Sequence, residues 1–219
     1  DSSNIYSGVD MTQEAINVYN KGYYFYTGTN GYPKDHKKAL ACFSEASQMG
    51  VPEAMNYIGL MYEMGDAIEQ DFERSYRWYL RALRANHTNK FASYKLGLFH
   101  YQGVAVPKDL KIATDYFLNA AKFGSSEAMN ELGLICEAGM GVPQNYTKAM
   151  EWYLRAIRTN NKNRLALYNA ARMYYNGWGV EKNIDRAYTY LNASIALGIN
   201  IGDANFAKSS YLMGCLLLE

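Results

Sequence analysis

The sequence predicts an all-α protein built from repeated pairs of helices. The ten residues RWYLRALRAN at Arg77–Asn86 return as EWYLRAIRTN at Glu151–Asn160, 74 residues further along the chain. A small residue also recurs at intervals of 36 to 38 residues, and apolar residues around it follow a helical period. No alternating apolar and polar pattern of a strand competes with this period. A repeat of this length is typical of stacked helical units.

The first helix of each unit is marked by a small anchor residue near its middle. In most units an alanine lies five residues before the anchor, and in every unit a glycine lies six residues after it. The anchors are Gly22, Gly59, Gly97, Gly133 and Ala171. The helical segments around them are Asn17–Gly28, Ala54–Gly65, Ala92–Gly103, Ala128–Gly139 and Ala166–Gly177. Residues without a large side chain allow close approach of a second helix.

The second helix of each unit begins after a short loop that ends in a capping residue. These caps are Asp35, Asp71, Asp109, Asn145 and Asn183. Their side chains can accept hydrogen bonds from the first free N–H groups of a helix. Small residues follow four and eleven positions after each cap, and an aromatic residue generally lies seven positions after it. We expect these aromatic residues, Trp78, Tyr116, Trp152 and Tyr190, to fill the space beside the anchors.

These patterns divide the chain into five units. We expect them at about residues 12–50, 51–86, 87–124, 125–160 and 161–198. A polar lead-in at residues 1–11 precedes them, and a partial sixth repeat or C-terminal helix at residues 199–219 follows.

The combined pattern resembles the Sel-1-like repeat family, whose members are related to tetratricopeptide repeats. Ala128–Ala156 fits it best and departs only where Cys136 replaces a tyrosine. Other departures are Ala171 for glycine and His100 for tyrosine. The resemblance implies a right-handed α/α superhelical solenoid with five full repeats and a partial sixth. It also implies that the first helices line a concave face, and that the protein is a non-enzymatic adaptor or scaffold for other proteins.

Composition argues against several kinds of partner. The net charge is +1, so no basic excess indicates nucleic acid or an anionic membrane. No run of about 18 apolar residues predicts membrane insertion. The three cysteines and three histidines are scattered, which indicates single buried thiols and no metal site. The sequence predicts no cofactor, and the expected partner is a protein or peptide.

No catalytic motif stands out from the repeat. The chain lacks the glycine-rich phosphate loop, the serine nucleophile elbow and the paired-histidine zinc motif. Its GMGV and GWGV segments occupy the turns of the repeat. We therefore expect that the protein is not an enzyme.

The units alternate in sequence, and the alternation reaches the surface expected to bind. Residues three before and four after each anchor lie on one helical stripe. That stripe carries tyrosine pairs in units one, three and five, and an asparagine with a glutamate in units two and four. The candidate partner-binding residues are Tyr19, Tyr26, Asn56, Glu63, Tyr94, Tyr101, Asn130, Glu137, Tyr168, Arg172 and Tyr175. Glu63 and Glu137 would favour cationic side chains.

An alternative for the same tyrosines is internal packing. Aromatic residues at helical spacing are found in cores more often than in sites. The sequence leaves both interpretations open, and full burial of Tyr94 and Tyr168 between repeats would rule out the binding one.

Three sequons, at Asn86, Asn145 and Asn192, would be glycosylation sites in a secretory lumen. They weakly favour that lumen, the cell exterior or a bacterial envelope over the cytoplasm. The resemblance accordingly implies two narrower functions beside the general scaffold. One is a luminal adaptor subunit of an endoplasmic-reticulum-associated degradation complex containing a ubiquitin ligase. The other is a bacterial envelope or host-interaction protein.

The C-terminal segment Tyr211–Glu219 is apolar and has no second helix after it. Solenoids need a polar terminal repeat to stay soluble. We therefore expect Leu212, Leu216 and Leu217 to contribute to a homodimer or to a continuation of the repeat array.

Overall fold

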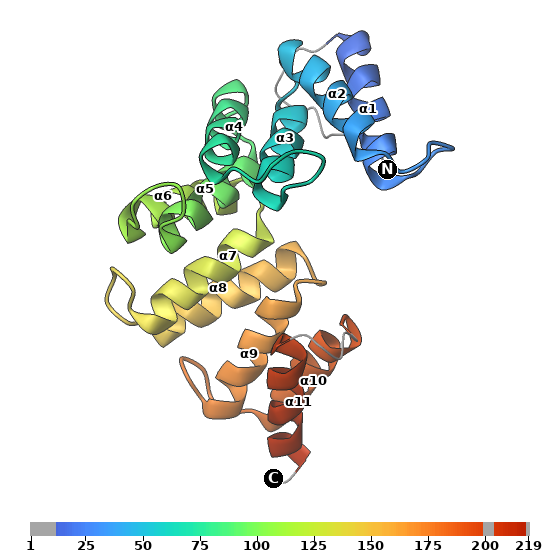
Figure 1. Cartoon of the computed structure of the whole chain (residues 1–219). Coiled ribbons are helices and arrows are strands. Elements are labelled where there is room, and N and C mark those ends of the chain that lie inside the picture. Colours follow the sequence, from blue (N-terminus) through green and yellow to red (C-terminus); the bar gives the residue numbers. More distant parts are fainter. Residues whose placement is uncertain (1–11, 199–203, 218–219) are drawn as a thin grey trace. The chain divides into compact units, whose positions relative to one another are not determined.

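The computed structural model describes residues 12–198 and 204–217, which form helices joined by turns (Figure 1). The chain divides into two compact units, Asp1–Phe123 and Gly124–Glu219. The predicted lead-in at residues 1–11 lies outside the described residues. So do residues 199–203 and 218–219 of the predicted partial sixth repeat.

Each of these two compact units contains several of the predicted repeats. Every repeat is an antiparallel helix pair, in which an A helix is followed by a B helix. The first unit contains the pairs α1 (Gln13–Thr27) and α2 (His36–Gln48), α3 (Pro52–Met64) and α4 (Phe72–Ala85), and α5 (Lys90–Gln102) and α6 (Leu110–Lys122). The second contains α7 (Ser126–Ala138) and α8 (Tyr146–Thr159), α9 (Arg164–Asn176) and α10 (Ile184–Ala196), and then α11 (Ala204–Leu217). The most extensive contacts are those within pairs.

The ends of the helices confirm the capping prediction. All five B helices begin after a predicted cap, whose side-chain oxygen accepts from the backbone N–H three residues on. The cap's own N–H donates to a carbonyl near the end of the preceding A helix, as Asp71 does to Tyr62 at 3.0 Å. Each A helix ends on a glycine in the left-handed conformation, with φ between 67° and 72°. Local sequence thus fixes both ends of the turn inside every pair.

The aromatic residue beside each glycine anchor lies one position later than the sequence analysis predicted. A Cβ added to Gly59 would lie 2.8 Å from the Tyr79 ring, and one added to Gly97 would lie 2.6 Å from Phe117. Residues eight positions after the caps are fully buried, namely Phe43, Tyr79, Phe117, Tyr153 and Leu191. The expected Trp78, Tyr116, Trp152 and Tyr190 are only partly buried.

The positions of these aromatic residues explain why the segment WYLRA recurs in the sequence. Tyr79 fills the core, while the preceding Trp78 stays near the surface under the Arg81 guanidinium, 4.3 Å from the ring centroid. Arg155 covers Trp152 in the same way at 5.2 Å. Arginine over the face of tryptophan is a favourable cation–π arrangement. The tryptophans thus cover the B helix and do not fill the space at the anchor.

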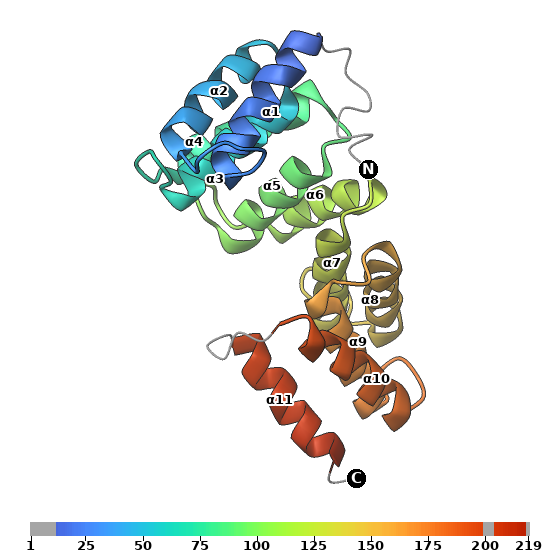
Figure 2. The same ribbon diagram turned by 90° about the vertical axis from the view of Figure 1, so that its right-hand side faces the viewer.

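The C-terminal helix α11 packs against α9 and α10 within the second unit (Figure 2). Leu212 and Leu216 are buried in the same cluster as Tyr174 and Leu191. These two side chains thus pack within the chain, and their contribution to a homodimer or to a continuation of the repeat array stays a prediction. Leu217 is 72% exposed and remains at the surface.

Candidate binding surface on the A helices

The predicted stripe of tyrosines contributes to internal packing as well as to the surface. In α1, the rings of Tyr19 and Tyr26 flank Phe43 of α2, with centroid distances of 5.9 and 6.2 Å. The same arrangement joins Tyr94 and Tyr101 to Phe117, at 6.0 and 6.3 Å. Tyr19 is buried, whereas the other tyrosines of the stripe are partly exposed. Tyr94 and Tyr168 are therefore not fully buried between repeats.

The two glutamates of the stripe already have partners in the chain. Tyr79 donates its hydroxyl to Glu63 at 2.8 Å, and the Lys95 ammonium of the next A helix lies 2.9 Å from the same carboxylate. Burial, followed by the nearby Glu63 charge, raises the pKa of Tyr79, so its hydroxyl stays a donor. The predicted preference for cationic side chains is met here by the protein's own lysine.

Glu137 occupies the equivalent position in the second unit and is bound more tightly. The Arg172 guanidinium makes two hydrogen bonds to its carboxylate, at 2.6 and 2.7 Å, and Tyr153 donates a third at 2.7 Å. Three helices, α7, α8 and α9, meet at this carboxylate. Arg172 was predicted as a partner-binding residue, and the structure shows it in an ion pair that links two repeats.

The asparagines of the stripe form buried amide pairs between neighbouring A helices. Asn56 and Asn89 exchange two hydrogen bonds of 3.1 and 3.3 Å. Asn169 donates to Asn130 at 2.9 Å, and Asn130 is only 1% exposed. These amides hold adjacent repeats together, so they are occupied within the chain.

In the first four repeats, the alternation therefore has an internal cause. Where the B helix carries phenylalanine, which has no hydroxyl group, the A helix supplies tyrosines around it. Where the B helix carries tyrosine, the A helix supplies a glutamate that accepts its hydroxyl. The period of 74 residues thus reflects two alternative contacts between the A helix and the B helix of a pair.

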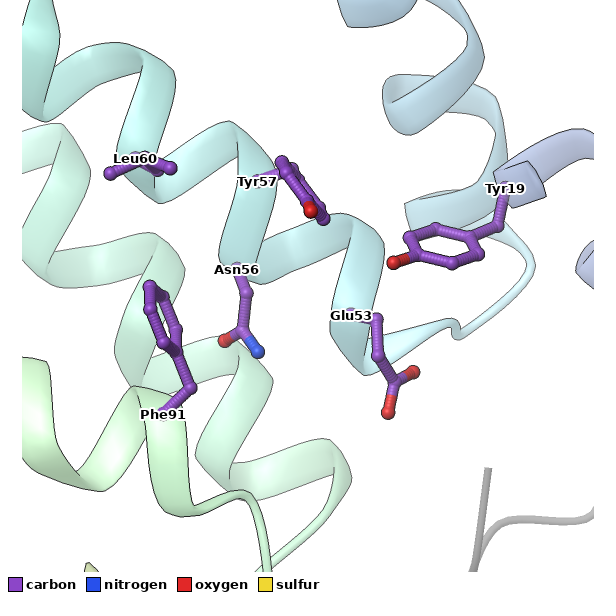
Figure 3. A pocket seen from close by; sticks show the side chains of 6 residues that line it. All are labelled: Tyr19, Glu53, Asn56, Tyr57, Leu60 and Phe91. Atoms are coloured by element: carbon purple, nitrogen blue, oxygen red, sulfur yellow. The ribbon is translucent and has the colours of Figure 1, made fainter. Parts of the chain in front are cut away.

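A pocket of about 170 Å³ opens on the A-helix side of the first unit. Tyr19 of α1 and Phe91 of α5 lie on opposite sides of it, with Glu53 and Asn56 of α3 between them (Figure 3). Tyr57 and Leu60 complete its lining. Of these residues, the sequence pattern indicates Tyr19 and Asn56 as binding candidates and gives no signal for the others.

Glu53 is the unusual member of this pocket. Its Oε2 atom is buried and accepts no hydrogen bond from any described residue. Burial raises the pKa of its carboxyl group. Its position as the second residue of α3 is visible in the sequence, but its burial is not.

Other reactive side chains lie in unreactive surroundings. Cys42 and Cys136 are free, and burial raises the pKa of both thiols, which makes them weaker nucleophiles. His100 is buried, with Nε2 3.0 Å from the Tyr76 hydroxyl. Residues 12–198 and 204–217 contain no cluster of three or more histidines, cysteines or carboxylates that could hold a metal.

The three sequons differ in exposure. Asn192 is exposed on α10. Asn145 caps α8 by accepting from the Lys148 N–H, and the Asn86 side chain accepts two hydrogen bonds from Thr88. Asn192 is thus the most accessible of the three. In the part of the chain that the structure describes, every helix is too short or too polar to cross a membrane.

Family models place this architecture among known proteins. The Sel1 repeat model matches residues 19–51, 52–87, 90–124, 126–161 and 164–199. The chain belongs to the Sel1 repeat family. Each of the five matched segments falls on one of the five predicted helix pairs.

Two curated relatives are components of a plant ubiquitin ligase. The chain is 29% identical over 100 residues to the ERAD-associated E3 ubiquitin-protein ligase component HRD3B of Arabidopsis thaliana, and 32% identical over 93 residues to HRD3A. These matches cover 46% and 41% of this chain, but only 15% and 13% of the relatives. The similarity therefore concerns a small part of those proteins.

Solved structures of bacterial proteins share the fold over most of the chain. A protective antigen present in uropathogenic Escherichia coli strains is 25% identical, with a TM-score of 0.75 over 93% of this chain and 41% of its own. A Sel1 repeat protein from Oxalobacter formigenes is 22% identical, with a TM-score of 0.76 over 92% of this chain and 87% of its own. The second likeness shows the fold alone.

Proposed function

We propose that this protein is a non-enzymatic adaptor that binds a polypeptide on the face formed by its A helices. The observation that carries the proposal is the pocket between α1, α3 and α5, which has aromatic walls and opens on that face. Aromatic side chains with a polar tip provide large contact areas at low entropic cost and are frequent binding hot spots. Membership of the Sel1 repeat family supports an interaction role.

The internal packing narrows the surface that a partner can use. The amides of Asn56 and Asn130 and the carboxylates of Glu63 and Glu137 are engaged within the chain. The exposed edges of the tyrosines remain, together with the pocket. A partner would therefore contact aromatic edges and apolar side chains between these internal bridges.

Affinity capture from the source cells tests the proposal. The double variant Tyr94→Ala/Tyr168→Ala removes two partly exposed rings from A helices. The matched control Leu118→Ala/Tyr188→Ala removes two exposed side chains from the B helices α6 and α10. We expect a partner that is lost with the first variant and kept with the second, both being shown to remain folded by their melting temperatures. Full retention by the first variant would contradict the proposal.

A second, narrower function is favoured by the two plant relatives, which are ubiquitin ligase components in ERAD by name. In that function the protein is an adaptor in the lumen of the endoplasmic reticulum. Occupancy of the Asn192 sequon, together with capture of a ubiquitin ligase subunit, would support it. An unmodified Asn192 in the native protein would instead favour a bacterial envelope or host-interaction role.

A further inference from the structure

The pocket on the first unit combines aromatic walls with a carboxylate that has one oxygen without a hydrogen-bond partner. The lining residues come from three A helices, and the Oε2 atom of one of them, Glu53, is buried without a hydrogen bond from any described residue. A buried charge without a partner costs free energy. A ligand that brings a positive charge to this oxygen would recover that cost when it binds.

The surrounding rings are held in place before any ligand arrives. Tyr57 stacks on Phe43, with centroids 4.7 Å apart and an interplanar angle of 11°. Burial raises the pKa of Tyr57 to about 12, so its hydroxyl remains neutral and does not compete with Glu53 for a cation. Phe91 packs edge-on against Tyr79 at 6.0 Å. Rigid aromatic faces attract cations and add little entropic cost on binding.

The protein's own cation near the pocket is already engaged. The Lys95 ammonium lies 5.8 Å from the Phe91 centroid, but it forms the 2.9 Å ion pair with Glu63. The Asn56 amide is likewise bonded to Asn89. The partly exposed Glu53 carboxylate is thus the anionic group of the lining that a ligand would meet.

We propose that this pocket receives a lysine or arginine side chain of a bound polypeptide, with its cationic head on the Glu53 carboxylate. The inference rests on the proposed function, and it specifies the chemistry of one anchor in the partner. Charge complementarity selects a basic residue, because an anionic one would face the same carboxylate. The aromatic walls hold the aliphatic stem and the face of the cationic group.

Single-residue probes test the anchor directly. N-acetyl-arginine amide and N-acetyl-lysine amide are titrated into the whole protein, with N-acetyl-citrulline amide as the neutral isostere of arginine, and binding is followed by NMR shifts of α3 and α5. We expect a dissociation constant on the order of millimolar for a basic probe, and at least about tenfold weaker binding of citrulline. Equal binding of the arginine and citrulline probes would overturn the proposal. So would the absence of binding of either basic probe at a concentration 20-fold above the expected dissociation constant.

A matched pair of variants assigns the effect to one carboxylate. Glu53→Gln should weaken binding of the basic probe at least about tenfold, whereas Glu127→Gln should leave it unchanged. Glu127 occupies the equivalent position 74 residues further along the chain, is exposed and accepts a hydrogen bond from Ser125. Phe91→Leu, which copies Leu165 of α9, should weaken binding by about two- to fivefold through loss of the ring face. Unchanged affinity in Glu53→Gln would contradict the inference.

Stability separates a binding role from a structural one. Because Glu53→Gln removes a buried charge that no described residue pairs, its melting temperature should stay level or rise by about 2–4 °C. A fall of several degrees would assign Glu53 to the fold and overturn the proposal. Failure of the probes with partner capture intact would refute only the anchor. Failure of capture in the A-helix variant would refute the proposed function.

Discussion

At the residue scale, one missing side-chain atom sets the distance between the helices of a pair. A Cβ on Gly97 would lie 2.6 Å from two atoms of the Phe117 ring, closer than real contacts allow. The fifth repeat solves the same problem differently, because Ala171 stands at the anchor and the smaller Leu191 takes the place of the ring. The size of the residue at the anchor and the size of the side chain that faces it therefore depend on each other.

This coupling can be measured with a double-mutant cycle. Gly97→Ala should lower the free energy of unfolding by about 1–3 kcal/mol, because the added methyl overpacks the contact with Phe117. In the Phe117→Leu background the same change should cost at least about 1 kcal/mol less. Gly214→Ala on α11, where the new methyl would meet no atom within 4 Å, is the control. Additive effects of the two changes in chemical denaturation would refute the coupling.

His100 gives the fold a specific pH dependence. Burial lowers the pKa of its imidazole, although the nearby Asp109 and the backbone of Pro107 act in the opposite direction. The unfolded chain, with a histidine pKa of about 6.5, thus binds more protons on acidification than the folded one. Stability contributed by neutral His100 is present above that value and lost as pH falls through the lower folded pKa.

The measurement is the difference in unfolding free energy between wild type and His100→Phe at pH 7.5 and pH 5. We expect the wild type to lose more stability on acidification than the variant does. Carboxyl groups titrate in both proteins, so their contributions to the pH dependence cancel in this difference. One of them is Glu53, whose raised pKa makes stability change with pH in the opposite direction. A difference that does not change with pH would contradict the account of His100.

At the element scale, neighbouring A helices are joined by polar bridges in addition to apolar packing. In the second unit, Glu137 of α7 joins Tyr153 of α8 and Arg172 of α9. In the first unit, Glu63 of α3 joins Tyr79 of α4 and Lys95 of α5. The two bridges differ chiefly in their cation, since arginine binds with two nitrogens and lysine with one.

Removing the cation should therefore lower the free energy of unfolding more in the second unit than in the first. Arg172→Ala leaves a largely buried carboxylate without its bidentate partner and should cost roughly 2–3 kcal/mol of stability. Lys95→Ala should cost about 1 kcal/mol, because a single hydrogen bond to a charged group is lost. Denaturant titration of both variants gives the comparison. An equal or larger loss for Lys95→Ala would count against this ranking.

Much of the architecture could be predicted from the sequence because its signals are local. Capping residues, helix-ending glycines and small anchors each act within one helix pair, and these elements are found at the predicted positions. The period alone did not separate Trp78 from Tyr79, since adjacent positions on a helix can both lie near the apolar face. The crossing of two helices at Gly59 makes that choice.

The candidate site was harder to predict because it depends on contacts between repeats. The partners Asn56 and Asn89 are 33 residues apart, and Glu137 and Arg172 are 35 apart. The periodicity of a single helix does not show which of these side chains meet. The pocket that contains Glu53 likewise takes its lining from three A helices at once.

At the scale of the whole molecule, the repeats present two kinds of surface. On the A helices, partly exposed tyrosines and the pocket lie among side chains fixed by internal bridges. On the B helices, arginines cover the tryptophans Trp78 and Trp152. The proposed adaptor function requires that a partner contacts the first surface.

Site-specific photo-crosslinking in the source cells tests this requirement most directly. A benzophenone amino acid replaces Tyr23 or Phe91 on A helices, or Leu118 or Tyr188 on B helices, all between 38% and 45% exposed. Matched exposure makes accessibility equal, so only the contacted face should decide the yield. We predict polypeptide adducts from the Tyr23 and Phe91 positions and few from the other two. Adducts from Leu118 and Tyr188 without any from Tyr23 and Phe91 would contradict binding through the A helices.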